Sequence, residues 1–590
     1  MNLNAKNIEK ILNIYLLFGI LFIYYIILNF QGLDVTDFGY HLTNQYSLLN
    51  YPIDTIDFNP LFLLSDIAGG LWLSLIGYPS VLWANIGGAL LYAICACIVY
   101  SILVNYFNKK MVFYVVLIST LFLTMRSGCY INYFTFPALL ILIELWILNK
   151  LLLLNPQSKQ YDLFGFLLGF MLIPIILSRI TLVLIFLIPV AFIFYFVLKK
   201  ENLNKYKKIA VIATIGLFSS IIVFTCVYIY LGIFESSIAN IMSTFGQSAS
   251  GNITNFNKSH SMAGLIYSYI IDYRNILIGT GIVVFGLWIL SQIKKKIGNF
   301  FSNILLISIP LSGILFVFIS GISADFFSIN ILKVTIGLVL LLTALFFWVD
   351  KGENRNISLL LIAGTIIMII NPVGSGCGVL KSMYAFWLIL PLSLLCAYQI
   401  RTSINNPRIS SILSMIPAIL IALLIISIFF QSVNVYRDDP NRLNLNEGFS
   451  HPSLFGIYST NERVEVVDEL LIAIEGNSQK GDELLMVNSI PMFYYLTETK
   501  PALGNPWIFL NPIEKIKFEQ TKLENEHRYP ELFIVPKVNT RIRYWPDSDL
   551  TTLSITDQEK LSYLKYIYIN KLNYTNTWEN EAFEIYMRDD

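Results

Sequence analysis

The sequence is poor in charge and in cysteine for its length. Only 13% of its 590 residues are charged, whereas 56% are hydrophobic and the mean hydropathy is +0.64, values that exclude a soluble protein. The net charge of +1, with Lys and Arg scattered among loops, argues against a nucleic-acid partner. Four of the six cysteines lie in apolar stretches, so only Cys129 and Cys377 lie outside them and no disulfide framework is implied. The composition indicates a polytopic membrane protein.

Long apolar stretches recur through the first 430 or so residues. A helix needs roughly 17–25 apolar residues to cross the hydrocarbon core of a bilayer. The first stretch is expected to be retained, since it is long and no small-residue cleavage site follows it. We predict thirteen membrane helices, at about 11–29, 81–105, 111–125, 135–149, 162–178, 180–198, 209–232, 276–293, 302–320, 331–349, 357–370, 384–400 and 411–431.

The distribution of basic residues predicts the orientation of these helices. Cytoplasmic loops carry the excess of Lys and Arg. With the N-terminus inside, the cytoplasmic segments of the membrane domain hold eighteen Lys and Arg residues, and the outer segments hold six. We therefore expect the loop after the first helix, and the C-terminal region, to lie outside the cytoplasmic membrane.

The composition changes beyond Gln431, because 25 of the 39 acidic residues fall in the last 159 positions. We predict a membrane domain over 1–432 and a soluble α/β domain over 433–590, whose size suits one domain. We expect this second domain to position an acceptor or to be structural. Its expected elements are a helix around 462–474 and strands at 483–487, 532–536, 566–569 and 583–587.

The loop from Gln31 to Ser80 holds more than a third of the acidic residues found before residue 432. Asp37 and His41 are four positions apart and therefore share one face if the segment is a short helix at the membrane surface. A carboxylate there suits a general base acting on a hydroxyl, with an apolar rim raising its pKa. The alternative, solvated loop charges, stays open for Asp34 and Asp37 and is what we expect for the others. The five acids are Asp34, Asp37, Asp54, Asp57 and Asp66.

Four features together resemble a known family. They are the run Asp37-Phe-Gly-Tyr-His-Leu42 in a long loop after the first helix, about thirteen helices followed by a soluble outer domain, Arg179 at a helix end, and the glycine-rich run from Asn371 to Lys381. In these features the chain resembles the GT-C superfamily of integral-membrane glycosyltransferases, such as protein O-mannosyltransferases and the aminoarabinose transferase that acts on lipid A. Members take sugars from polyprenyl-phosphate donors outside the cytoplasmic membrane.

The resemblance implies roles for particular residues. Asp37 matches the first acid of the family's Asp-Glu pair, but Phe38 occupies the place of the Glu, so the assignment of the base between Asp37 and Asp34 stays open. Together with His41 they form the expected catalytic set. Oligosaccharyltransferase-like members hold a divalent metal with acids of the second outer loop, and that loop, from Arg126 onwards, has none here. We therefore expect no cofactor and no metal site.

A polyprenyl-phosphate donor needs cations, since negative charge builds on the leaving oxygen as the glycosyl bond breaks. The candidates are Arg179, Arg126 and Lys381, all at the outer ends of predicted helices. Arg179 is nearly the only polar residue between two long apolar stretches, and the glycines before Lys381 expose backbone N–H groups that suit an anion. Snorkelling towards lipid headgroups is the alternative for each residue alone.

These observations predict an inverting glycosyltransferase. It would move a hexosyl or pentosyl unit from a polyprenyl-phosphate donor to a cell-envelope glycan, lipid or protein. A polysaccharide polymerase or ligase is the first alternative, although its large loop is expected between late helices. A transporter or flippase for lipid-linked glycans is the second, although it needs ionisable residues deep in several helices and only Glu144 fits.

Overall fold

The structure is a computed structural model of the whole chain. It describes residues 12–52, 56, 58–124, 130–201, 206–238, 267–286, 324–350, 353–373, 378–403, 407–547 and 549–588. By its internal contacts the chain forms two compact units. The first, here called the membrane unit, comprises Met1–Phe22, Leu91–Met125 and Phe134–Gln431. The second comprises Ile23–Leu90, Arg126–Tyr133 and Ser432–Asp590, and we call it the outer unit after the side of the membrane predicted for it.

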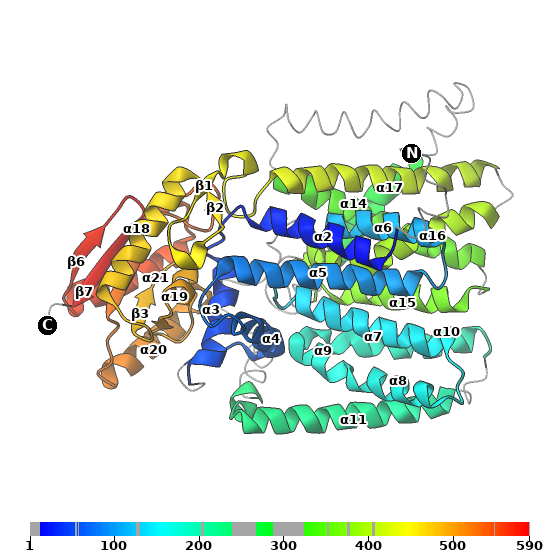
Figure 1. Cartoon of the computed structure of the whole chain (residues 1–590), viewed down its shortest axis with the longest axis horizontal. Coiled ribbons are helices and arrows are strands. Elements are labelled where there is room, and N and C mark those ends of the chain that lie inside the picture. Colours follow the sequence, from blue (N-terminus) through cyan, green and yellow to red (C-terminus); the bar gives the residue numbers. More distant parts are fainter. Residues whose placement is uncertain are drawn as a thin grey trace. The chain divides into compact units, whose positions relative to one another are not determined.

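Helices occupy nearly all of the described part of the predicted membrane domain (Figure 1). Within the described residues, eight helices are long and apolar enough to cross a membrane. Residues 267–286 are also helical and begin the predicted span at 276–293, whereas the span predicted at 302–320 lies outside the described residues. The helices that coincide with predicted spans are α2 (Ile14–Asn29), α5 (Val81–Leu103), α6 (Lys109–Leu121), α7 (Thr135–Leu153), α8 (Lys159–Phe170), α9 (Leu172–Ser178), α10 (Leu187–Leu198), α11 (Lys207–Tyr230), α14 (Ala324–Asp350), α15 (Arg355–Ile370), α16 (Phe386–Ser403) and α17 (Pro407–Val433).

Short helical turns supplement these helices. The 3-10 turn η4 (Ile180–Phe186) continues into α10, and η6 (Gly378–Ala385) continues into α16, so that each pair makes one long apolar segment. The polytopic membrane fold predicted from composition is therefore confirmed. The remaining 3-10 turns are η2 (Pro60–Phe62), η3 (Phe122–Thr124), η7 (Arg442–Asn444), η8 (Pro452–Leu454), η9 (Ile508–Leu510) and η10 (Leu550–Thr552).

Small residues bring helices α8 and α11 of the membrane unit into close contact. A β-carbon added at Gly169 would overlap the carbonyl of Ala213, and one added at Gly216 would overlap the carbonyl of Phe166. Small residues spaced about one turn apart let two helix backbones approach each other, which is how helices associate where lipid removes the hydrophobic driving force. The glycines of these two helices therefore fix their packing.

The C-terminal part of the outer unit is built on a five-stranded sheet with the order β4-β3-β5-β7-β6. Strand β3 is parallel to β4 and β5, whereas β7 is antiparallel to β5 and β6. Central β5 is buried along its whole length, as expected of a strand covered on both faces. The strands are β3 (Glu483–Met486), β4 (Lys500–Pro501), β5 (Leu532–Pro536), β6 (Tyr574–Glu579) and β7 (Phe583–Arg588), with a separate pair β1 (Glu447–Gly448) and β2 (Tyr458–Ser459).

The predicted helix around 462–474 and the strands at 483–487, 532–536 and 583–587 are present, but the predicted strand at 566–569 is wrong, and β4, β6 and three further helices were not predicted. Residues 566–569 belong to the helical turn η11 (Tyr566–Lys571), which continues helix α21. Alternating Tyr and Ile suggested a strand, yet a wide helical turn also buries Ile567 and Tyr568, and Tyr568 stacks on Phe533. The helices of this domain are α18 (Asn461–Asn477), α19 (Met492–Leu496), α20 (Ile513–Asn525) and α21 (Ile555–Lys565).

The loop that follows α2 folds onto this domain within the outer unit. It contains two helices, α3 (Asp37–Asn50) and α4 (Leu63–Leu73). A β-carbon at Gly39 would overlap the backbone of Met492, so a glycine lets α3 and α19 touch. Apolar residues on and before α3 share one hydrophobic core with α18 and β3, and each fully buried apolar side chain stabilises the fold by about 1.5–3 kcal/mol. This shared core fixes the position of the acidic loop against residues near the far end of the chain.

Candidate functional site

Asp34 holds the start of helix α3 together. One carboxylate oxygen accepts hydrogen bonds from the backbone N–H groups of Thr36 (2.9 Å) and Asp37 (3.2 Å), and the other accepts one from Phe38 (3.1 Å). The first N–H groups of a helix have no partner within the helix, and an Asp just before it satisfies them. The side chain of Asp34 is buried. Asp34 therefore caps α3 from two positions before Thr36, the N-cap residue, whose own side chain makes no capping hydrogen bond.

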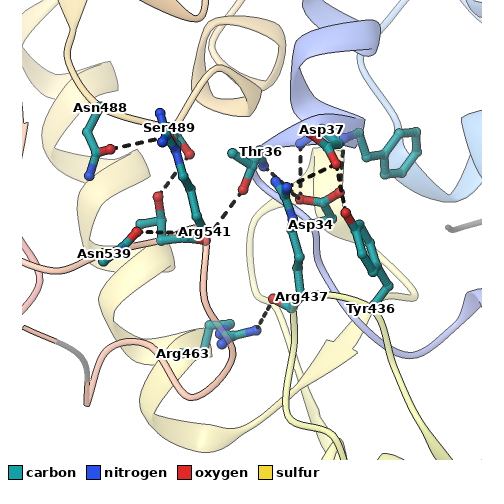
Figure 2. Close-up of polar contacts among 12 residues, drawn as sticks. Asp34, Thr36, Asp37, Tyr436, Arg437, Arg463, Asn488, Ser489, Asn539 and Arg541 are labelled. Carbon is teal, nitrogen blue, oxygen red and sulfur yellow. Dashed lines mark hydrogen bonds and ion pairs between the residues drawn. The ribbon is translucent and has the colours of Figure 1, made fainter. Parts of the chain in front are cut away.

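Asp37 lies at the first position of α3 and is more accessible than Asp34. Its side chain is 36% exposed, against 9% for Asp34. One of its oxygens, Oδ2, accepts a hydrogen bond from the Tyr436 hydroxyl (2.8 Å) and lies 3.1 Å from Nη2 of Arg437 (Figure 2). Asp37 is thus a carboxylate fixed on one side and open to solvent.

Arg437 serves both acids and is itself held firmly. Its Nη1 lies 3.9 Å from Asp34, and its backbone adopts φ of 56°, a left-handed conformation that costs a non-glycine residue about 1 kcal/mol or more. The Arg437 carbonyl accepts a hydrogen bond of 3.2 Å from Arg463, which Figure 2 shows below the acid pair. Arg463 in turn pairs with buried Asp438 at 2.5 Å.

Asp438 also contacts the loop before α3 and strand β2. It accepts hydrogen bonds from the backbone N–H of Leu33 (2.8 Å) and from the hydroxyl of Ser459 (2.8 Å). Arg463 also donates two hydrogen bonds to the carbonyl of Trp545, at 2.8 and 3.1 Å. A buried ion pair needs such additional hydrogen bonds to offset the loss of hydration. The Asp438–Arg463 ion pair therefore holds the backbone of Arg437 in place.

Burial and charge act in opposite directions on the acid pair. Burial raises the pKa of the Asp34 carboxyl, against the charge of Arg437 and the backbone donors, which lower it. The pKa of Arg437 is raised, because Asp34 and Asp37 outweigh the effect of its burial. The pKa of Tyr436 is raised by burial and by the charge of Asp37, so its hydroxyl stays neutral and donates to that carboxylate.

His41 lies beside a different acid. It is on the same helix as Asp37, as predicted, but its Nδ1 lies 3.7 Å from Oδ1 of Asp66, and both side chains are buried. Burial raises the pKa of the Asp66 carboxyl, which His41 partly offsets. The expectation that Asp66 is a solvated loop charge is wrong, because α4 packs against α3 and buries it. Asp54 and Asp57 lie outside the described residues.

Aromatic rings surround His41. Tyr130 stacks on Phe38 with ring centres 4.3 Å apart, and its ring centre is 5.8 Å from that of His41. Phe62 and Tyr133 also contact the imidazole ring, at 5.9 and 5.1 Å. The His41–Asp66 pair therefore lies in a largely apolar part of the outer unit.

Two of the three predicted donor-binding cations come together in the membrane unit. The guanidinium of Arg179 lies 4.6 Å from the centre of the Phe134 ring, and Nζ of Lys381 lies 3.9 Å from it. Arg179 is buried and donates a hydrogen bond of 3.1 Å to the carbonyl of Val373. Arg126 lies outside the described residues. Their proposed role in binding phosphate stays a prediction.

Within the described residues, no group of three or more His, Cys, Asp or Glu side chains is placed to hold a metal ion. Asp34 and Asp37 face an arginine rather than a third acid. A cation-binding role for this pair would require Arg437 to move away. The expectation that no metal is used stays a prediction.

Sequence reasoning missed several residues of this site. Tyr436, Arg437 and Asp438 follow α17 directly, and they reach the acidic loop from about 400 positions away in the chain. The only signal in the sequence is the polar run Tyr436-Arg-Asp-Asp439 immediately after the last apolar stretch. Such a run is usual at a membrane boundary, so it did not point to Asp37.

Comparisons with known proteins give matches among solved structures alone. No family model matches the chain, and no curated protein matches its sequence. The apo crystal structure of ArnT from Cupriavidus metallidurans aligns over 97% of each chain, at 9% identity and a TM-score of 0.45. The same protein bound to undecaprenyl phosphate aligns over 97% of each chain, at 9% identity and a TM-score of 0.42.

The oligosaccharyltransferase AglB from Archaeoglobus fulgidus, in complex with an inhibitory peptide and a dolichol-phosphate, is a third match. It aligns over 88% of this chain and 69% of its own, at 11% identity and a TM-score of 0.46. ArnT and AglB are both members of the superfamily that the sequence resembles. Since the TM-scores of these three matches lie between 0.42 and 0.46, the function proposed below rests on the residues of this chain.

Proposed function

We propose that the protein is an inverting glycosyltransferase that uses a polyprenyl-phosphate sugar as its donor. The observation that carries the proposal is Asp37, an accessible carboxylate with one oxygen fixed by Tyr436 and Arg437. A carboxylate held in this way suits a general base, because its orientation is set while part of it stays open to a substrate. Its place in the loop that carries the superfamily's acid supports the same role.

In the proposed reaction Asp37 takes the proton of an acceptor hydroxyl. The freed oxygen bonds to the anomeric carbon of the donor sugar, on the face opposite the phosphate, and the bond between that carbon and the phosphate oxygen breaks. The polyprenyl phosphate leaves with the electron pair, and the configuration at the anomeric carbon inverts. We propose Asp34 as the residue that positions Asp37, because its carboxylate caps the helix that carries it.

The leaving phosphate needs positive charge near it. We propose Arg179 and Lys381 as its contacts, with Arg126 as a third, because arginine and lysine at the ends of apolar helices reach the depth of lipid headgroups. The reaction takes place on the outer face of the cytoplasmic membrane, in agreement with the excess of basic residues in the opposite loops. The acceptor is a glycan, lipid or protein of the cell envelope.

The test is transfer of radiolabelled sugar by the protein purified in detergent. Wild type is given polyprenyl-phosphate hexoses and pentoses with membrane lipids and cell-envelope glycans as acceptors. We expect Asp37→Asn to reduce transfer about 10²–10⁴-fold, the usual contribution of a general base. Asp549→Asn is the matched control, because Asp549 is exposed and asparagine caps a helical turn equally well.

Two outcomes would count against this proposal. Wild type that transfers no sugar with any donor would return the polymerase and transporter alternatives to first place. Transfer by Asp37→Asn at the wild-type rate would show that this carboxylate is not the base, even if the protein is a transferase.

A further inference from the structure

The outer unit contains a pocket that is lined in part by Arg463. Its volume is about 440 Å³, enough for a sugar residue or two. The walls come from three separate segments of the chain, at 439–446, 460–463 and 544–547. The proposed mechanism uses none of the side chains that line it.

Most of the pocket lining is polar. The side chains of Asn444, Asn446 and Asn461 offer both donors and acceptors, and the carboxylates of Asp439, Glu462 and Asp547 offer acceptors. Within the described residues, none of these three carboxylates lies in an ion pair with a lysine or arginine. Asp439 accepts hydrogen bonds from its own segment, namely from the backbone N–H of Asn441 and the side-chain amide of Asn444.

Among these lining residues the cation is Arg463, whose charge also acts on Asp439 but is already paired with Asp438. Its guanidinium is 1% exposed and is paired with Asp438 behind it, while its remaining hydrogen bonds go to backbone carbonyls. The pocket therefore presents a negative surface. Anionic groups are repelled from such a surface, whereas hydroxyl and ammonium groups find acceptors there.

An exposed aromatic ring completes the wall. Tyr544 is 60% exposed, whereas the neighbouring Trp545 is buried with the Arg463 guanidinium 4.2 Å from its ring centre. An exposed tyrosine beside hydrogen-bonding groups provides an apolar face and a polar edge, a combination that suits the C–H face of a sugar ring. Trp545 belongs to the protein core, as its burial shows.

We propose that this pocket binds a sugar residue of the acceptor glycan, one that is neutral or carries a free amino group. This role rests on the proposed function, since it is the acceptor that needs a site on the outer unit. The pocket is joined to the candidate base through few residues: Arg463 lines the pocket and donates to the carbonyl of Arg437, whose side chain holds Asp37.

The test measures binding of three oligosaccharides to the full-length protein in detergent, by ligand-observed NMR titration. They are tetramers of glucosamine, which is cationic, of N-acetylglucosamine, which is neutral, and of galacturonic acid, which is anionic. We expect the glucosamine tetramer to bind most tightly, the neutral tetramer more weakly and the anionic tetramer not at all. Raising the salt concentration should weaken only the cationic ligand.

Two pocket variants and two matched controls locate the binding. Tyr544→Ala should weaken Kd about tenfold for the cationic and the neutral tetramer, and Glu462→Gln should do so mainly for the cationic one. Tyr566→Ala and Glu559→Gln remove an equally exposed tyrosine and glutamate outside the pocket and should leave Kd unchanged. Unchanged melting temperatures would show that all four variants fold.

The outcomes separate this inference from the proposed function. Equal binding of all three tetramers, binding of none, or wild-type affinity in both pocket variants would overturn the pocket assignment whether or not sugar is transferred. Charge-selective binding that depends on Tyr544 and Glu462, in a protein that transfers no sugar, would support the glycan site and overturn the transferase.

Discussion

Asp34 and Asp37 stand three positions apart in one loop, share one arginine and differ in almost everything else. Asp34 is buried, and its carboxylate accepts hydrogen bonds from three backbone N–H groups. The side chain of Asp37 is over a third exposed and is held by those of Tyr436 and Arg437. Two aspartates that look alike in the sequence thus differ in the groups that donate hydrogen bonds to them. A carboxylate saturated by the backbone stabilises a helix, and one left open is available to a substrate.

After Asp37→Asn, the largest expected effect on transfer comes from removing the arginine that both acids share. Arg437→Gln leaves two nearby carboxylates without their cation, and we expect transfer activity to fall about a hundredfold, equivalent to about 2.7 kcal/mol. The pKa of Asp34, which Arg437 lowers, should rise further. Measuring transfer at several pH values checks this, and wild-type activity for Arg437→Gln would mean that Asp37 needs no fixed orientation.

Removing Asp34 should affect stability more than chemistry. Asp34→Ala deletes the cap of α3, and we expect the free energy of unfolding to fall by about 1–2 kcal/mol. A thermal unfolding series in detergent measures this loss. If Asp34→Ala instead abolishes transfer while the melting temperature stays at the wild-type value, the assignment of the two acids should be reversed.

Asp66 provides a test at a second buried acid. Its pKa is raised in the folded state, so its contribution to stability is fully present below the unfolded pKa of about 4 and is lost as the pH rises through the folded pKa. Relative to Asp66→Asn, wild type should therefore gain stability as the pH is lowered from 8 to 4. Melting temperatures of both proteins across this range measure the trend, and a constant difference would contradict it.

The smallest expected effect is at the phenol that touches Asp37. Tyr436→Phe removes one hydrogen bond of 2.8 Å and keeps the ring, so transfer should fall about fivefold, equivalent to about 1 kcal/mol. Tyr529→Phe is a suitable control, because its ring packs against Arg588 elsewhere in the outer unit. A loss as large as that of Asp37→Asn would make Tyr436 a participant in proton transfer.

Local features of the sequence predicted much of this fold. Apolar length gave the membrane helices, and a short helix carrying Asp37 and His41 is present as expected. Helix α18 was likewise predicted from the spacing of its apolar residues.

The features that could not be predicted from the sequence mostly depend on contacts between residues that are distant in the chain. Arg437 and Tyr436 meet Asp37 across about 400 positions, and no local pattern encodes that pairing. Asp66 was misjudged for the same reason, because its burial depends on how α4 packs on α3. Residues 566–569 were misjudged because a short alternating run suits a strand and a helical end alike.

The distance in sequence between Asp37 and Tyr436 also has a consequence for biosynthesis. Tyr436 lies 399 positions after Asp37, and at about 5–20 residues per second a ribosome needs roughly 20–80 s to cover that distance. During that interval the loop around Asp37 has neither Arg437 nor the core it shares with α18 and β3. A nascent chain therefore carries an unfinished acid pair until its last membrane helix has been synthesised.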